Sequence, residues 1–150
     1  QIVEIIRSTV FENASVFTEW NSPEFAPEKV TGFNIYRSPG NMKFELIATV
    51  PASAHSFLDT EADVSVQNYY YKVQTLNTCL VKGQMSNNAS SILLETERDG
   101  YDVKLKWTPY KNWENGVGQY IIEIQAENGN WKTVKIVDGN ITEEKDLLIK

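Results

Sequence analysis

Short runs of alternating apolar and polar residues recur along the chain, and stretches rich in turn-forming residues separate them. β-Branched and aromatic side chains dominate these runs, and a period of two places them on one face of a strand. The clearest runs are residues 15–20, 32–37 and 69–75, with a Pro-Gly-Asn turn within residues 38–41. Helix signals are nearly absent. The pattern predicts an all-β sandwich.

An internal repeat is the most informative feature of the sequence. Placing Trp20 on Trp107 gives an offset of 107 − 20 = 87, and the register then holds without a gap across four predicted strands. The matched apolar pairs are Val16 with Val103, Phe33 with Tyr120, Ile35 with Ile122, Phe44 with Trp131, Ile47 with Val134, and Val50 with Val137. The repeat predicts one structural unit used twice. Residues 1–89 would form a complete copy, and residues 90–150 would hold the front strands of a second.

Composition and charge narrow the classes of function. An apolar fraction of 41% with 11% aromatic residues indicates a globular protein, and no apolar stretch is long enough to span a bilayer. The net charge of −6, with no cluster of Lys or Arg, argues against nucleic acid as a partner. A single cysteine, Cys79, and a single histidine, His55, exclude a zinc site of the Cys/His kind. The sequence indicates no cofactor and no enzyme.

The order of these runs resembles fibronectin type III repeats of the bacterial extracellular kind. The strand ending in Trp20 is followed by four further segments, at residues 32–37, 44–50, 57–60 and 69–73. The resemblance implies that Trp20 is the buried tryptophan of strand B and that Tyr69 is the tyrosine-corner residue. Tyr71 and Val73 would then point inward, and Tyr70 and Lys72 outward, as a period of two requires.

A narrower likeness is to tandem repeats in bacterial surface proteins associated with gliding motility and type IX secretion. It is carried by residues 73–79, 85–87, 91–94, 105–113 and 118–120. The likeness implies a modular, secreted or outer-membrane-associated protein without activity of its own. Its partners would be other domains of the same chain and proteins of a surface complex, with polysaccharide as a further candidate. Some of these relatives carry a second cysteine where residues 95–102 have none, which implies that Cys79 is buried or free.

A scaffold or adhesion segment of a larger surface protein is therefore the function expected. The main alternative is an accessory repeat, or a carbohydrate-binding repeat, of a secreted polysaccharide-degrading enzyme. Three Asn-x-Ser/Thr triplets begin at Asn13, Asn88 and Asn140, and they would be glycan acceptors in a eukaryotic secreted chain. In a bacterial chain they would be coincidental.

Three groups of side chains are candidates for a catalytic or metal-binding site. Ser53 and Ser56 flank His55, but neighbours on one strand point to opposite faces and do not make a catalytic triad. Asp59, Glu61 and Asp63 have the alternate spacing of a calcium loop. The glycine and the final acid that such a loop needs are Val64 and Tyr70, so a solvated strand connection is the expected role. Carboxylates near the junction of the repeats, Asp99, Asp102 and Glu114, were a further possible group.

The candidate ligand-binding residues are Trp113 and Tyr110, which lie in a predicted loop of the second copy. Flat exposed rings bind sugars, whereas a large aromatic side chain in a loop more often packs against its own or a neighbouring domain. Both interpretations stay open from the sequence.

The second copy lacks its last two strands. Tyr69 carried forward by 87 falls at position 156, beyond Lys150. We expect the exposed inner face to be completed by residues after Lys150, with a strand from a partner as the alternative. The start at Gln1, directly in strand-like residues, likewise indicates a segment of a longer protein.

Overall fold

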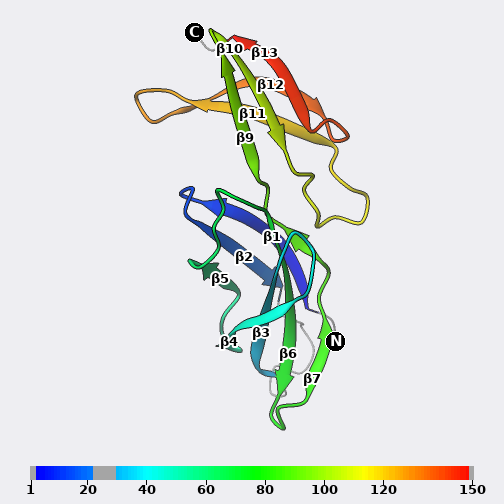
Figure 1. The fold of residues 1–150 in the computed structure, drawn as a ribbon. Coiled ribbons are helices and arrows are strands. Elements are labelled where there is room, and N and C mark those ends of the chain that lie inside the picture. The colour runs from blue at the N-terminus through cyan, green and yellow to red at the C-terminus, as the bar shows by residue number, and fades with distance from the viewer. Residues whose placement is uncertain (1–2, 22–29, 149–150) are drawn as a thin grey trace. The chain divides into compact units, whose positions relative to one another are not determined.

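The computed structural model describes residues 3–21 and 30–148, and within them the chain is built of β-strands and turns (Figure 1). The chain divides into two compact units. Unit 1 comprises Gln1–Leu93 together with Tyr110–Asn112, and unit 2 comprises Leu94–Pro109 and Trp113–Lys150. Across the described residues no helix has the length and apolar character needed to cross a membrane.

Unit 1 consists of two antiparallel sheets. One sheet has the order β1-β2-β5, and the other has the order β4-β3-β6-β7 with β8 also paired to β6. The strands are β1 (Glu4–Phe11), β2 (Ser15–Asn21), β3 (Val30–Pro39), β4 (Glu45–Pro51), β5 (Ser56–Asp59), β6 (Tyr69–Asn77), β7 (Lys82–Met85) and β8 (Ala89–Ser90). The turn between β1 and β2 places Glu12 and Asn13 at positive φ, and the amide of Ala14 donates to the Phe11 carbonyl across it. In the second sheet β7 and β8 both pair with β6. A three-stranded sheet facing a sheet built on β4, β3 and β6 is the arrangement of an immunoglobulin-like sandwich of the fibronectin type III kind.

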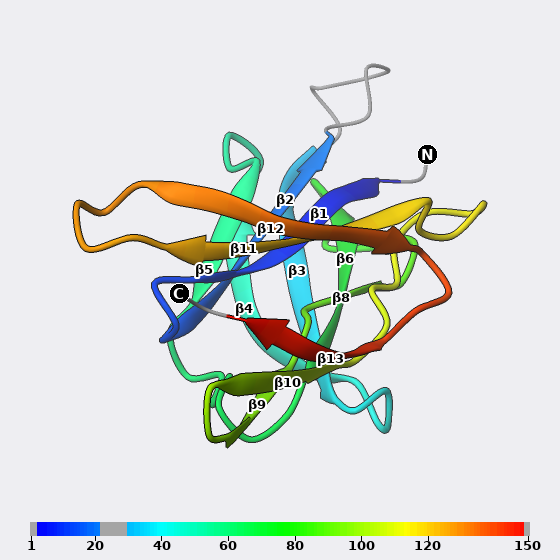
Figure 2. The ribbon, with the colours of Figure 1, turned by 90° about the horizontal axis from the view of Figure 1, so that it is seen from above.

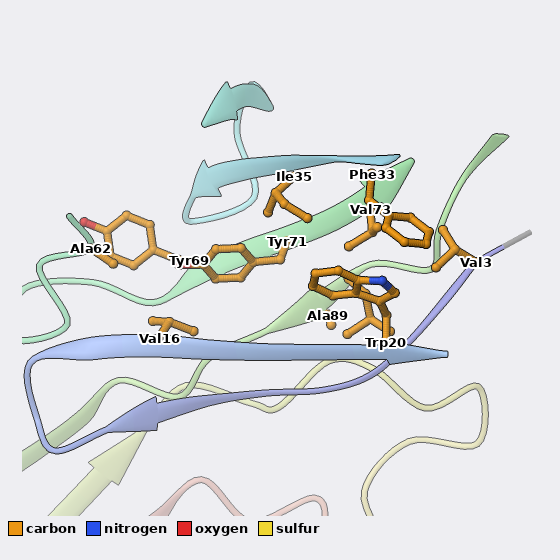
Figure 3. Close-up of a cluster of buried hydrophobic side chains, with 11 residues drawn as sticks. Val3, Val16, Trp20, Phe33, Ile35, Ala62, Tyr69, Tyr71, Val73 and Ala89 are labelled. Carbon is orange, nitrogen blue, oxygen red and sulfur yellow. The ribbon is translucent and has the colours of Figure 1, made fainter. Parts of the chain in front are cut away.

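The core of unit 1 lies between its two sheets, as Figure 3 shows. Trp20 is 1% exposed, and its ring meets the ring of Phe33 edge to face, with 5.5 Å between the centroids. Tyr71 and Val73 are fully buried, while Tyr70 and Lys72 between them are only half-buried. Trp20 is therefore a core residue, and β6 alternates as a period of two requires from Tyr69 to Val73.

Unit 2 repeats the front strands of the same sandwich. Its sheets have the orders β13-β10-β9 and β11-β12, and Figure 2 shows β13 running beside β10. The strands are β9 (Leu94–Asp99), β10 (Asp102–Trp107), β11 (Gln119–Gln125), β12 (Trp131–Asp138) and β13 (Glu143–Leu148). These five strands span residues 94–148, and they correspond to β1 to β5 of unit 1.

Two structural details of unit 1, an aromatic contact and an irregularity in strand pairing, recur in unit 2 at the offset of 87 residues. Trp107 meets Tyr120 edge to face at a centroid distance of 5.5 Å, as Trp20 meets Phe33. The irregularity in pairing between Ile35 and Tyr36 recurs between Ile122 and Glu123, at the same offset. The fold is thus a tandem of fibronectin type III-like sandwiches, the second of which is incomplete.

Candidate functional site

His55 lies in the turn before β5, and its side chain is exposed. Its carbonyl accepts a hydrogen bond from the Trp20 amide at 3.0 Å, which ties this turn to β2. Ser53 and Ser56 are also exposed. A triad needs a nucleophile, a base and an orienting acid that converge on one point, and the nearest buried acid, Asp59, is engaged elsewhere.

The carboxylate of Asp59 is the centre of a buried polar cluster, the Asp59 cluster, formed with Arg37 and Tyr71. One guanidinium nitrogen of Arg37 lies 3.0 Å from each carboxylate oxygen, and the Tyr71 hydroxyl donates to the carboxylate at 2.8 Å. The amide of Glu61 also donates to Asp59, at 3.1 Å. The cluster links β5 to β3 and β6 across the sandwich, so Asp59 is a structural residue and does not turn toward a calcium loop.

Burial raises the pKa of Tyr71 well above its ordinary value, and the neighbouring Asp59 charge raises that pKa further. The Tyr71 hydroxyl therefore stays protonated and acts as a hydrogen-bond donor at physiological pH. Tyr69 completes the corner: its hydroxyl accepts hydrogen bonds from the Asp63 amide and the Gln67 side chain, each at 3.1 Å. Tyr69 is the tyrosine-corner residue that the sequence predicted.

The other acids of these two groups lie at strand ends and in loops. Asp63 accepts hydrogen bonds from the amide and hydroxyl of Ser65, and Asp99 pairs with Asp102 across the β9–β10 turn. Glu114 is exposed in the loop after β10. Within residues 3–21 and 30–148, no three His, Cys, Asp or Glu side chains are grouped so that they could hold a metal ion.

The two candidate aromatic residues fall in different units. Trp113 belongs to unit 2 and its side chain is 57% exposed, whereas Tyr110 belongs to unit 1 and is half-buried. The Tyr110 hydroxyl accepts a hydrogen bond from the Ser8 amide of β1 at 3.3 Å. Burial raises the pKa of Tyr110, and the hydrogen bond from Ser8 partly offsets this rise. Tyr110 therefore packs within unit 1.

Tyr110 is one of three consecutive residues, Tyr110–Asn112, that unit 1 takes from the sequence of the second repeat. The Lys111 amide donates to the Ser90 hydroxyl at 2.9 Å, and the Ser90 amide donates to the Lys111 carbonyl at 2.7 Å. Asn112 donates to the Ile6 carbonyl and accepts a hydrogen bond from Asn87 at 2.6 Å. This segment therefore completes the edge of the first sandwich next to β1 and β8.

Comparison of the two copies reveals a surface that the sequence analysis did not single out. In unit 1, Asn34 of β3 and Thr49 of β4 lie opposite each other on the outer face of the sheet, and the Thr49 hydroxyl donates to Asn34 at 2.7 Å. At the same positions of unit 2, offset by 87, stand Ile121 and Ile136. They are again opposite each other, and they are 61% and 53% exposed. A hydrogen-bonded polar pair has been replaced by an exposed apolar pair.

Trp131 extends this surface along β12. It lies opposite Gln125 of β11 and is 63% exposed. Gln125 is four residues after Ile121 on the same strand, so alternation places Gln125 and Trp131 on the face of the Ile121–Ile136 pair. We call Ile121, Ile136 and Trp131 the outer patch of unit 2. The sequence alone contained the signal for the isoleucines, because the alignment at offset 87 sets Asn34 on Ile121 and Thr49 on Ile136.

The single cysteine and the asparagines of the three Asn-x-Ser/Thr triplets lie in turns and at strand ends. Cys79 is free, and it is exposed in the turn between β6 and β7. Asn13 and Asn140 are exposed in turns, whereas Asn88 is half-buried and its amide nitrogen donates to Asn41 at 3.1 Å.

Among known proteins, no family description matches this chain, and no curated protein matches it either. A fibronectin type III-like protein from Clostridium thermocellum shares 20% identity over 57% of this chain and 83% of its own, with a TM-score of 0.48. Pectate lyase PelI from Erwinia chrysanthemi shares 21% identity over 60% of this chain, with a TM-score of 0.50. A β-1,2-glucanase from Parabacteroides distasonis shares 16% identity over 60% of this chain, with a TM-score of 0.51.

This chain covers only 28% of that lyase and 12% of that glucanase. The likeness therefore shows that a part of each enzyme shares the fold of a part of this chain.

Proposed function

We propose that this chain is a non-catalytic scaffold and adhesion segment of a larger bacterial protein, acting outside the cell or at its surface. The parent would belong to a surface, motility or secretion assembly of the gliding and type IX kind. The sandwiches act as spacers, and unit 2 presents a contact face to another protein. Support for the extracellular and bacterial part of the proposal comes from the sequence resemblance.

The observation that carries the binding role is the outer patch of unit 2. In unit 1 the pair consists of Asn34, which is 4% exposed, and the exposed Thr49, whereas both isoleucines at the same positions of unit 2 are exposed. Exposed apolar side chains grouped on one sheet face are typical of protein contact surfaces, and aromatic residues are enriched there. Unit 1 supplies the internal comparison, because at the same position it carries the hydrogen-bonded polar pair Asn34–Thr49.

The experiment is a cell-binding assay with a matched variant. The purified chain is labelled and incubated with intact cells of the source organism, and the bound fraction is measured against the double variant Ile121→Asn/Ile136→Thr. That variant copies the pair that unit 1 already uses, so its fold should be kept. We expect saturable binding by the parent chain and a loss of about tenfold in the variant, as for removal of apolar contacts worth roughly 1.4 kcal/mol. Equal binding by both chains would refute the role of the outer patch, and no binding would refute adhesion.

A second candidate function is an accessory repeat of a secreted polysaccharide-degrading enzyme. The likeness to parts of a pectate lyase and a β-1,2-glucanase favours it. Gel retardation by polygalacturonate or β-1,2-glucan, lost in the Trp113→Ala or Trp131→Ala variant, would support this candidate over protein adhesion. In neither case do we expect turnover of substrate by the chain itself, with or without His55.

A further inference from the structure

The outer edge of β1 in unit 1 is closed by side chains instead of by a strand. Among the described strands, β1 pairs with β2 on one side and with no strand on the other. The side chains of Asn87, Tyr110 and Asn112 bind the backbone of β1. We call these three side chains the edge cap. Without such a cover, an edge strand presents a row of unpaired N–H and C=O groups to which another chain can pair.

The Asn87 side chain imitates a residue of a neighbouring strand. Its Oδ1 accepts a hydrogen bond from the Ile5 amide at 2.7 Å, and its Nδ2 donates to the Ile5 carbonyl at 3.1 Å. Two residues that face each other in an antiparallel ladder exchange the same two bonds. A side-chain amide can replace one of them because it carries both a donor and an acceptor. Both backbone groups of Ile5 are therefore bonded as they would be inside a sheet.

The other two members of the edge cap continue along β1. Asn112 donates from Nδ2 to the Ile6 carbonyl. Its Oδ1 accepts a hydrogen bond from Asn87 at 2.6 Å, so the two asparagines hold each other in place. The Tyr110 hydroxyl accepts a hydrogen bond from the Ser8 amide at 3.3 Å. The edge cap thus binds the backbone of β1 at three of its residues.

The strand behind the edge cap has the composition of a strand that pairs readily with copies of itself. Residues 5–11 read Ile-Ile-Arg-Ser-Thr-Val-Phe, and Arg7 is the only charged residue among them. Segments rich in β-branched and aromatic residues, without proline or glycine, add to other strands when their edge is exposed. The same edge on two molecules can pair antiparallel about a two-fold axis. A second copy of this chain is therefore the occupant that fits the edge.

We propose that the edge cap is an autoinhibitory device that keeps β1 from pairing with the β1 strand of a second copy. Two of its three residues lie in the segment Tyr110–Asn112, which belongs to the sequence of the second repeat. The hydrophobic core of unit 1 contains neither Tyr110 nor Asn112. Release of the segment therefore exposes the edge and leaves the core in place. This self-association requires no cell surface and no other protein, so it is separate from the proposed scaffold function.

The test compares the oligomeric state of the full 150-residue chain with that of the double variant Tyr110→Phe/Asn112→Ala. The variant keeps the aromatic ring but removes the polar atoms that bind β1, and Asn87 loses the side chain that holds it. We expect the parent to be a monomer in analytical ultracentrifugation and the variant to form dimers as its concentration rises. The matched control is Tyr101→Phe, which removes the hydroxyl of an 89% exposed tyrosine and should stay monomeric.

Hydrogen exchange locates the change within unit 1. At low concentration the Ser8 amide should exchange about fivefold faster in the variant, as for the loss of one hydrogen bond. The Trp20 amide, which donates to the His55 carbonyl, should exchange as in the parent and shows that the sandwich is intact. At high concentration the Ser8 amide should become protected again, because a second copy supplies its partner. The single variant Tyr110→Phe gives the same comparison with the loss of one hydroxyl only.

A charge on β1 tests whether this strand forms the dimer contact. Thr9 is exposed, and adding Thr9→Lys to the double variant places a second cation on the strand that carries Arg7. It should return the variant to a monomer, whereas Thr9→Ser should leave the dimer unchanged. Dimers of the parent chain, a variant that stays monomeric, an unchanged Ser8 amide, or dimers that survive Thr9→Lys would each overturn the proposal.

Discussion

Replacement of Asp59 by Asn tests whether the Asp59 cluster holds the sheets of unit 1 together. The Asp59 side chain is 3% exposed, and it receives hydrogen bonds from Arg37, Tyr71 and the Glu61 amide. Asn keeps nearly the same shape but removes the negative charge that faces the guanidinium. The substitution therefore isolates the charge of the cluster from its packing.

The expected loss of stability follows from the burial of both partners. Removing one partner of a buried ion pair costs about 3–5 kcal/mol, because the other charge is left without compensation. The Arg37 side chain is 24% exposed and its guanidinium lies 5.4 Å from the centre of the Tyr69 ring, so part of its charge stays solvated or stabilised. We therefore expect the lower end, about 3 kcal/mol. For a unit of this size that is a fall in Tm of roughly 10–20 °C.

Calorimetry of the full chain measures this loss, with hydrogen exchange assigning the transition to unit 1. The matched control is Glu19→Gln, which removes only the exposed pair of Arg7 with Glu19 and should cost less than about 1 kcal/mol. The double variant Arg37→Leu/Asp59→Leu should recover part of the loss, because no buried charge is then left unpaired. The Tyr71 hydroxyl and the Glu61 amide still lose their acceptor in that variant. Unit 2 already carries Ile124 in place of Arg37. Equal effects of Asp59→Asn and Glu19→Gln would refute the reasoning.

The remaining predictions concern the buried core of unit 1, the stability of unit 1 at high pH, the segment Tyr110–Asn112 and hydrogen exchange in unit 2. Trp20→Ala should destabilise unit 1 by about 3–5 kcal/mol in urea unfolding, and a midpoint close to that of the parent would show that the ring is not buried. Because the pKa of Tyr71 is raised in the folded state, its contribution to stability is complete below pH ~10 and is lost as the pH rises further. The Tyr71→Phe variant should therefore show a smaller fall in Tm at alkaline pH than the parent chain. Asn112→Ala should destabilise unit 1 by about 1–2 kcal/mol through its lost hydrogen bonds, and a change confined to unit 2 would contradict the assignment of this segment. Amides near Tyr71 should exchange slowly and those near Ile122 quickly, whereas equal protection in a monomer would show that unit 2 is complete without a further strand.

The roles of individual aromatic residues were partly predictable. Alternation along the strand and the equivalence with Trp107 identified Trp20 as a core residue, because core positions are constrained by packing in both copies. Tyr110 shows the limit of this reasoning. Its sequence neighbourhood assigned it to a loop of the second repeat, but its hydroxyl bonds to Ser8, 102 residues earlier. No local pattern encodes a partner at that separation.

The acids show the same division. The alternate spacing of Asp59, Glu61 and Asp63 indicated either the first half of a calcium loop or a solvated connection between two strands. In the structure Asp59 turns inward to Arg37, which arrives from a strand 22 residues earlier, and to Tyr71. Whether a carboxylate binds a cation, a side chain or water depends on which groups surround it, and the sheets of the sandwich decide that.

The sequence by itself determined the all-β class, the repeat of 87 residues and the inward position of Trp20, Tyr71 and Val73, because burial imposes a period of two and the same core was used twice. It also contained the exchange of a polar for an apolar surface pair between the copies. Only the tertiary structure decided that Tyr110–Asn112 complete unit 1 and that Asp59 is bound by Arg37. These features depend on contacts between distant segments, which form only when the sheets assemble and which no periodicity along the chain can specify.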